Sequence, residues 1–322
     1  MAVIEVDDLT RRYRSRTGTF RRRAAIVEAL RGVSFAVERG ELFGLLGPNG
    51  AGKTTMIKVL TTLLLPTSGT ARVLGFDVRR EARRIRGRIG YVFGGDRGLY
   101  DRLSALDNLR YFADLYKVAP RERRARIDSL LELVELKGRE RERVETYSRG
   151  MKQRLHIARG LLHDPEILFL DEPTIGLDPI GARELRDTIA GLHEAGKTIL
   201  LTTHYMYEAD SLCQRIAVIA NGSFVATGSP SDLKALVGDN TIVEIETFGI
   251  ADEAIERLRR IPGVRGVGVE TRDQAQVLLV QSAVGADVVR ALLNELADAV
   301  TGKVVTREPT LEDAYVELVR SA

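Results

Sequence analysis

One short glycine-rich segment constrains this chain more than any other feature. Residues 47–55 read Gly-Pro-Asn-Gly-Ala-Gly-Lys-Thr-Thr and match the pattern G-x-x-x-x-G-K-T. A short, largely apolar run precedes the segment, and residues 56–60 continue with a helical pattern. Glycines let the backbone turn so that successive N–H groups point inward, and the start of the helix adds partial positive charge. The segment therefore predicts a loop that binds the phosphates of a nucleoside triphosphate.

The residue types in this loop indicate a role for each polar side chain. We expect Lys53 to reach the β- and γ-phosphates, Thr54 to coordinate Mg²⁺ and Thr55 to hold an α-phosphate oxygen. Within this loop, the residues expected at the nucleotide are Gly47, Pro48, Asn49, Gly50, Ala51, Gly52, Lys53, Thr54 and Thr55.

A second motif supplies two carboxylates. Residues 167–172 read Ile-Leu-Phe-Leu-Asp-Glu, which is a buried strand ending in two acids. Such a strand delivers Asp171 to the Mg²⁺ shell and Glu172 to the attacking water as its general base. Phosphoryl transfer demands little beyond positioning and charge stabilisation, so a held metal and one base suffice for hydrolysis.

Composition limits the other functions open to the chain. Its 322 residues are 44% hydrophobic and 29% charged, which is typical of a globular protein with one large core or two smaller ones. No apolar run approaches the roughly 18 residues that cross a bilayer, and the first residues do not begin a signal peptide. Cys213 is the only cysteine, which excludes an intramolecular disulfide.

The charge is small overall but unevenly placed. A net charge of +3 does not by itself indicate a nucleic-acid partner. Seven arginines gather between residues 11 and 23 with no acid among them. This basic cluster either faces anionic lipid heads or is a solvated loop.

The order of predicted elements indicates an α/β fold. Strands alternate with helices, which favours a mostly parallel sheet, with an all-helical subdomain at about residues 100–162 beside it. We expect strands at residues 3–6 (an edge strand), 29–37, 41–46, 70–74, 89–93, 167–170 and 198–202, and helices at 81–88, 150–162 and 184–194. Apolar residues at 127, 130, 131 and 134 form one buried helical stripe.

A boundary is expected near residue 238, so the predicted domains are 1–238 and 239–322. The second domain reads β-α-β-β-α-β, a small α+β arrangement, and closes with a helix near residue 309. Thr310 and Asp313 are spaced like a capping box at the start of that helix. No motif in this domain indicates chemistry, and we interpret it as regulatory or dimer-contacting.

A third motif makes a family resemblance specific. Residues 147–154 read Tyr-Ser-Arg-Gly-Met-Lys-Gln-Arg and are similar to the ABC signature, leucine-serine-glycine-glycine-glutamine, with Ser148 and Gly150 kept. Residues 175–178 resemble the D-loop of that family, and His204 its switch histidine. The resemblance covers residues 1 to about 238 and implies a P-loop NTPase fold of the ABC ATPase type. Residues 308–315 resemble the tail of the drug-resistance and sodium-exporter branch.

The resemblance also implies further site residues. Tyr13 matches the aromatic residue that stacks on adenine, and His204 the group that contacts the γ-phosphate and acts with Glu172. Ser148 and Gly150 match residues that bind the γ-phosphate on the opposite subunit, and Asp178 belongs to the same nucleotide-binding set. Taken alone, a tyrosine or a histidine at these places would more often be a packing residue.

The resemblance implies the ATP-binding and ATP-hydrolysing subunit of an ABC exporter, with ATP and Mg²⁺ as cofactors. We expect it to lie on the cytoplasmic side of the cell membrane and to power drug, lipid-like or ion efflux through a separate membrane-spanning permease. A second ATPase subunit would complete the dimer; we expect an identical copy, with a different ATPase subunit as the alternative, and no nucleic-acid partner is expected. A soluble ABC ATPase acting on ribosomes or DNA and an importer subunit remain alternatives, which the co-purifying partner would separate.

One departure from the family pattern concerns the metal. The family usually has a glutamine after the strand at residues 89–92, whereas this chain has Gly94-Gly95-Asp96. Our hypothesis is that Asp96 supplies an oxygen to Mg²⁺, directly or through water. The alternative is a flexible turn with water completing the metal shell.

Overall fold

The structure is a computed structural model that describes residues 1–17, 23–94, 98–236, 241–272, 275–297 and 299–320. The chain folds into two compact units, Met1–Pro230 and Ser231–Ser321. The domain boundary expected between residues 238 and 239 falls outside the described residues. Within the part of the chain that is described, no helix combines the length and the apolar content needed to cross a membrane.

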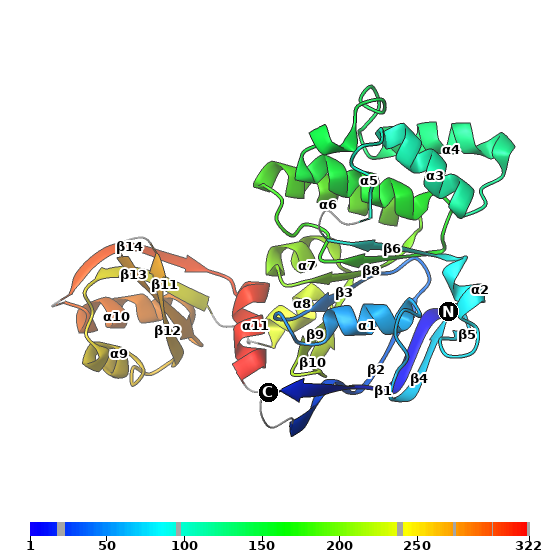
Figure 1. Ribbon diagram of the computed structural model, residues 1–322. Helices are drawn as coiled ribbons and strands as arrows, with labels where there is room; N and C mark the ends of the chain where they lie inside the picture. The colour runs from blue at the N-terminus through cyan, green and yellow to red at the C-terminus, as the bar shows by residue number, and fades with distance from the viewer. Residues whose placement is uncertain (18–22, 95–97, 237–240, 273–274, 298, 321–322) are drawn as a thin grey trace. The chain divides into compact units, whose positions relative to one another are not determined.

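A six-stranded sheet organises the first unit (Figure 1). Its order is β10-β9-β3-β8-β7-β6, and only β10 pairs antiparallel, which confirms the mostly parallel sheet. The interior strands β3, β8 and β7 are buried along their whole length. Strands β3 and β7 are nearly continuous apolar runs, as buried parallel strands usually are, whereas β8 also contains three threonines. The strands are β3 (Leu42–Leu46), β6 (Ile89–Phe93), β7 (Ile167–Asp171), β8 (Thr198–Thr203), β9 (Arg215–Ala220) and β10 (Ser223–Gly228).

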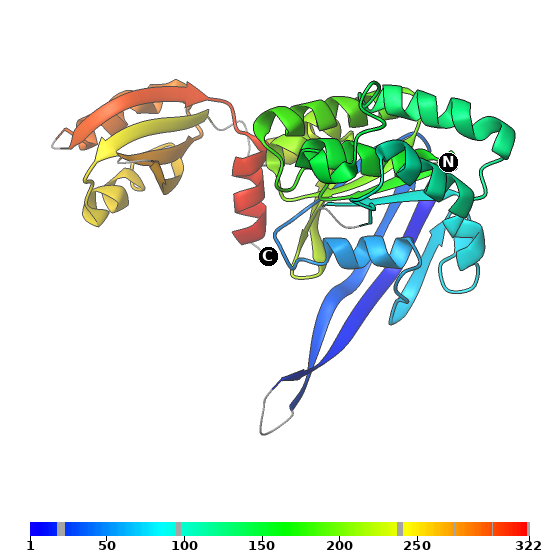
Figure 2. The ribbon, with the colours of Figure 1, turned by 45° about the horizontal axis from the view of Figure 1, so that its top comes forward.

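A second, four-stranded sheet corrects the expectation of an edge strand at the start of the chain. Its order is β2-β1-β4-β5, so β1 pairs on both sides. The described arginines of the basic cluster lie in the paired strands β1 and β2 rather than in a loop, and Arg12 pairs with Glu28. Figure 2 shows this hairpin projecting from the rest of its unit. The strands are β1 (Ala2–Thr17), β2 (Arg23–Glu38), β4 (Ser68–Val73) and β5 (Phe76–Asp77).

Helices cover both faces of the six-stranded sheet (Figure 1). Helix α1 (Lys53–Leu60) lies between the two sheets, where Met56, Ile57 and Leu60 join one buried core. On the other face, α5 (Arg149–Leu161) and α7 (Met206–Leu212) contact the sheet. Helices α3 (Ala105–Leu115) and α4 (Pro120–Leu133) pack on α5, α6 (Pro179–Glu194) packs on α5 and α7, and α2 (Ala82–Arg86) precedes β6. The buried stripe predicted for α4 is confirmed at residues 127, 130, 131 and 134.

Helix α6 begins five residues earlier than the apolar pattern predicted. The side chain of Asp178 accepts hydrogen bonds from two backbone N–H groups, those of Ile180 and Gly181, and Pro179 occupies the first helical position. Both features favour a helix start without any apolar residue, so the hydrophobic pattern alone does not detect them.

The second unit has the predicted β-α-β-β-α-β order. Its sheet, β12-β13-β11-β14, is antiparallel throughout, and Val243, Ile245, Leu278 and Leu292 lie in its core. The elements are α8 (Pro230–Ala235) at the boundary, β11 (Thr241–Phe248), α9 (Asp252–Leu258), β12 (Val264–Arg272), β13 (Ala275–Ser282), α10 (Val289–Glu295), β14 (Val300–Arg307) and α11 (Leu311–Arg320).

The capping box at the start of α11 is confirmed. The backbone N–H of Thr310 donates to Oδ2 of Asp313 at 2.7 Å, and the backbone N–H of Asp313 lies 3.4 Å from Oγ1 of Thr310. Asp313 also accepts two hydrogen bonds from the guanidinium of Arg307, which ties the last strand to the last helix.

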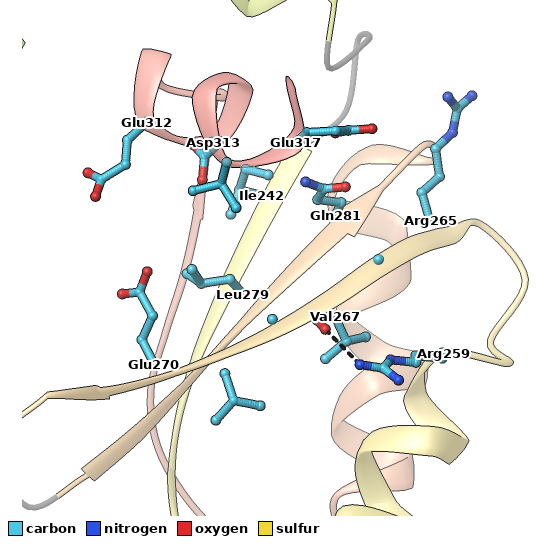
Figure 3. A pocket seen from close by; sticks show the side chains of 14 residues that line it. Ile242, Arg259, Arg265, Val267, Glu270, Leu279, Gln281, Glu312, Asp313 and Glu317 are labelled. Carbon is cyan, nitrogen blue, oxygen red and sulfur yellow. Dashed lines mark hydrogen bonds between the residues drawn. The ribbon is translucent and has the colours of Figure 1, made fainter. Parts of the chain in front are cut away.

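A hollow of about 560 Å³ lies between α11 and the face of β12 and β13 (Figure 3). Gly266 and Gly268 leave this part of β12 without side chains, and Leu279 lies on the neighbouring strand. Two charged residues of its lining are already paired inside the unit, Arg259 with Glu256 and Asp313 with Arg307. The residues that the sequence analysis singled out for catalysis lie in the first unit, not around this hollow.

Candidate functional site

The phosphate-binding loop connects β3 to α1, and its glycines are required by close contacts. A Cβ atom on Gly47 would lie 2.3 Å from the carbonyl oxygen of Ile219, and one on Gly52 would lie 2.4 Å from that of Ala29. Gly50 and Gly52 also have φ values of 83° and 113°, which residues with a side chain rarely adopt. The loop therefore turns tightly at its glycines, as the sequence predicts.

Lys53 is almost completely buried in the curve of this loop. Its Nζ donates to the carbonyl oxygens of Gly47 at 2.6 Å and Pro48 at 3.2 Å. The same Nζ lies 3.1 Å from Oε1 of Glu172 at the end of β7. A buried charge requires a partner of this kind, so the loop and the carboxylate strand are joined by one ion pair.

Asp171 meets the first turn of α1. The hydroxyl of Thr54 donates to Oδ1 of Asp171 at 3.2 Å, and the hydroxyl of Thr202 donates to the same oxygen at 2.6 Å. A hydroxyl and a carboxylate are hard oxygen ligands, which suit Mg²⁺ when phosphates supply the remaining oxygens. No group of three or more His, Cys, Asp or Glu side chains is placed to hold a metal among the described residues, so a purely protein-built metal cage is not present there.

His204 lies just after β8 and faces the carboxylate of Glu172. Its Nδ1 is 3.3 Å from Oε2 of Glu172, so the two oxygens of Glu172 face Lys53 and His204. Glu172 has a φ of 50°, in the left-handed region, which turns the chain directly after the strand. Three expected site residues from distant parts of the sequence therefore converge.

Tyr13 lies beside the first turn of α1. Its hydroxyl is 3.4 Å from Oγ1 of Thr55, and the guanidinium of Arg11 stands 4.8 Å from the centre of its ring. The structure thus brings the expected adenine-stacking residue next to the phosphate-binding loop.

Ser148, Gly150 and Asp178 lie at helix starts. The Oγ of Ser148 accepts the backbone N–H of Met151 at 3.2 Å and caps α5, as Asp178 caps α6. A Cβ on Gly150 would lie 3.7 Å from Cα of Gly181, so these two helix starts adjoin. Among the contacts found between described residues, none joins these three residues to Lys53.

Gly94 is the first of the three residues that stand where the family has its glutamine, and its surroundings exclude a side chain. Its backbone N–H donates to the carbonyl oxygen of Asp171 at 2.7 Å, and a Cβ would lie 2.4 Å from the carbonyl oxygen of Glu172. Asp96, the hypothetical replacement, lies outside the described residues, and its role at Mg²⁺ stays a prediction.

Two residues that the sequence analysis did not single out contact the carboxylate strand. Thr202 on β8 bonds to Asp171, and Tyr91 on β6 lies beside it. Burial, together with the negative charge of Asp171 and a hydrogen bond to it, raises the pKa of Tyr91 well above its usual value. A threonine near the end of a short strand, two residues before His204, was the available signal for Thr202.

Comparison with known proteins finds relatives among ABC transporter ATP-binding proteins. A family model described as ABC transporter matches residues 30–175. A daunorubicin resistance ATP-binding protein of Streptomyces coeruleorubidus is 42% identical over 294 residues, covering 90% of this chain and 91% of that protein. The Nod factor export ATP-binding protein I of Paraburkholderia xenovorans is 36% identical over 320 residues, covering 98% and 97%.

Solved structures agree with the fold. A dimeric ATP-binding cassette in a post-hydrolysis state, bound to ADP and phosphate, superimposes with a TM-score of 0.62 at 28% identity. The match covers 70% of this chain and 98% of that one.

Proposed function

This chain belongs to the ABC transporter family as an ATP-binding, ATP-hydrolysing subunit, and we propose that it powers export through a separate membrane-spanning permease. The family, the P-loop NTPase fold and the ATPase activity expected from the sequence are confirmed. The observation that carries the proposal is the convergence of Lys53 and His204 on the two oxygens of Glu172. Relatives named for drug resistance and Nod factor export support export.

The site residues divide the work of hydrolysis between them. Lys53 and the loop amides hold the phosphates, and Tyr13 stacks on the adenine. Glu172 accepts a proton from the attacking water, and His204 beside it contacts the γ-phosphate and acts with that carboxylate. Thr54 and Asp171 would hold Mg²⁺, which when bound offsets the charge of the phosphates. The products are ADP and inorganic phosphate.

A second copy of this chain completes the site. Ser148 and Gly150 begin α5 next to the start of α6, where backbone N–H groups and the helix dipole favour an anion. Their separation from Lys53 in one chain supports a role toward the nucleotide of a partner. The domain comprising residues 239–322 would then regulate or support this dimer.

The permease partner would dock on the helical subdomain. Five large side chains between residues 100 and 116 are 38% to 60% exposed: Tyr100, Leu103, Tyr111, Leu115 and Tyr116. The rings of Tyr100 and Tyr111 lie 5.1 Å apart, so aromatic side chains gather here rather than standing singly. Clustered apolar exposure of this kind marks interaction surfaces. Such docking would hold the chain at the cytoplasmic face of the cell membrane.

Two measurements test this proposal. Phosphate release from ATP by the purified chain should require Mg²⁺. Affinity purification from detergent-solubilised membranes should recover a membrane-spanning protein, and Tyr111→Glu should abolish its recovery while leaving phosphate release by the purified chain in place. Recovery of ribosomes or DNA instead would favour the soluble alternative, and a partner that takes up its substrate would favour the importer.

A further inference from the structure

The backbone of Glu172 has an unfavourable conformation, and its N–H group is bound by one neighbouring residue. Its φ of 50° lies in the left-handed region, where a side chain is disfavoured. The backbone N–H of Glu172 donates both to the carbonyl oxygen of Thr202 at 3.0 Å and to its Oγ1 at 3.1 Å. Thr202 therefore supplies both acceptors of this N–H group.

The same hydroxyl also acts on the preceding residue. Oγ1 of Thr202 donates to Oδ1 of Asp171 at 2.6 Å, and the parallel register of β7 and β8 places Asp171 opposite Thr202. A hydroxyl can donate and accept at once, and a β-branched side chain has few rotamers. Thr202 is fully buried, so water does not compete for these bonds.

Asp171 accepts hydrogen bonds from the hydroxyls of two threonines, one at the phosphate-binding loop and one on β8. Thr54 donates at 3.2 Å from the phosphate-binding loop and is itself expected at the metal. Thr202 makes the shorter bond from the buried strand and has no expected contact with metal or nucleotide. The bond from Thr202 is thus the one that orients Asp171 independently of a bound nucleotide.

We propose that Thr202 is a positioning residue that orients the metal-binding carboxylate of Asp171 and the backbone of the base Glu172 through a single hydroxyl. This rests on the proposed roles of Asp171 and Glu172. Groups that orient a metal ligand set its geometry and basicity, so their loss weakens metal binding even though they never touch the metal. Loss of the Thr202 hydroxyl should therefore alter the Mg²⁺ requirement rather than nucleotide binding as such.

Paired substitutions separate the hydroxyl from the packing. Thr202→Val keeps the shape and removes the hydroxyl, whereas Thr202→Ser keeps the hydroxyl. Thr198→Val is the matched control, because Thr198 is equally buried on the same strand and its Oγ1 accepts a bond from the backbone N–H of Gly40. The full chain is titrated with a fluorescent ATP analogue, once with Mg²⁺ and once with EDTA. The Mg²⁺ concentration for half-maximal hydrolysis and the thermal midpoint are measured in parallel.

We expect Thr202→Val to lower nucleotide affinity in Mg²⁺ about 10-fold and to raise the half-maximal Mg²⁺ concentration by a similar factor. Its affinity in EDTA should stay at the wild-type value, Thr202→Ser should restore the Mg²⁺ dependence, and Thr198→Val should not change it. If Thr202→Val does not fold, Thr202→Ala carries the same expectation.

Other outcomes identify which idea has failed. A wild-type Mg²⁺ dependence in Thr202→Val, an equal loss of affinity in EDTA, or a similar loss in Thr198→Val would overturn the role of Thr202. A wild-type chain that shows no Mg²⁺-dependent nucleotide binding would instead overturn the proposed function itself.

Discussion

His204 and Glu172 face each other just beyond two adjacent parallel strands, with Nδ1 of His204 3.3 Å from Oε2 of Glu172. The other oxygen, Oε1, lies 3.1 Å from Nζ of Lys53. The ion pair with Lys53 fixes one oxygen of the Glu172 carboxylate and leaves the other beside the imidazole of His204, so the groups needed for proton transfer are brought together within one subunit. The two neighbours of Glu172 come from the phosphate-binding loop and from the strand end 32 residues further on.

The first prediction concerns the base. Glu172→Gln keeps the shape of the side chain but cannot accept the proton, so turnover should fall by roughly 10²–10⁴. ATP binding should persist, because the amide oxygen of glutamine can still accept from Lys53. Phosphate release and equilibrium binding of ATP, measured on the same preparation, check both parts. Hydrolysis near the wild-type rate would exclude Glu172 as the base.

The second prediction concerns assembly. Ser148→Arg places a bulky cation at the start of α5, where the partner's γ-phosphate is expected, and should block ATP-driven dimerisation. Light scattering with ATP in the Glu172→Gln background gives the mass. The substitution also removes the cap on Met151, which by itself costs about 0.5–2 kcal/mol of stability.

Ser104→Arg is the matched control for that lost cap. Ser104 caps α3 by accepting the backbone N–H of Asp107 at 3.0 Å, and we expect its variant to dimerise with ATP. Dimers of normal mass in Ser148→Arg would contradict the assignment, and loss of dimers in both variants would attribute the effect to stability.

The residues that converge in the candidate site could be singled out from the sequence, whereas several strand pairings could not, and the reason is physical. Gly47, Lys53 and Asp171 are identified because phosphate binding requires particular residue types at a fixed spacing. The pairing of β1 on both sides is not readable from β1, because β4 joins it from 50 or more residues away in the sequence. Strands β9 and β10 were not predicted, and no motif marks them. The contact of Thr202 with Asp171 depends on which strands become neighbours, which is a property of the tertiary fold.

The third prediction concerns acid stability of the second unit. Burial raises the pKa of Asp313, but hydrogen bonds from Arg307 and Thr310 outweigh it and hold the pKa below its ordinary value of 3.8. A carboxyl with a lowered folded-state pKa stabilises the fold above its unfolded pKa and loses that contribution as the pH falls through the folded value. We therefore expect α11 to lose hydrogen-exchange protection below about pH 4.

Asp313→Asn should remove most of this pH dependence. It should also lower the free energy of hydrogen-exchange protection of α11 at neutral pH, by only about 1 kcal/mol because solvent partly screens the pairing with Arg307. Asp128→Asn is the control, because Asp128 forms a long, exposed pair with Arg124 in the first unit. An unchanged acid profile of α11 in Asp313→Asn would contradict the role of the Arg307 network.

The last prediction concerns the missing glutamine. Replacing Gly94 with glutamine would restore the family's residue type, yet its Cβ would lie 2.4 Å from the carbonyl oxygen of Glu172 and 2.6 Å from Cγ2 of Ile175. One of those contacts is with backbone, so the turn that carries the base would have to shift. We expect both Gly94→Gln and Gly94→Ala to lower the thermal midpoint and the rate of ATP hydrolysis. Gly191→Ala is the control: a Cβ there meets nothing within 4 Å, and alanine favours the helix by about 1 kcal/mol. A faster Gly94→Gln enzyme with an unchanged midpoint would show that position 94 accepts a side chain and that the glycine is not required by the packing around Glu172.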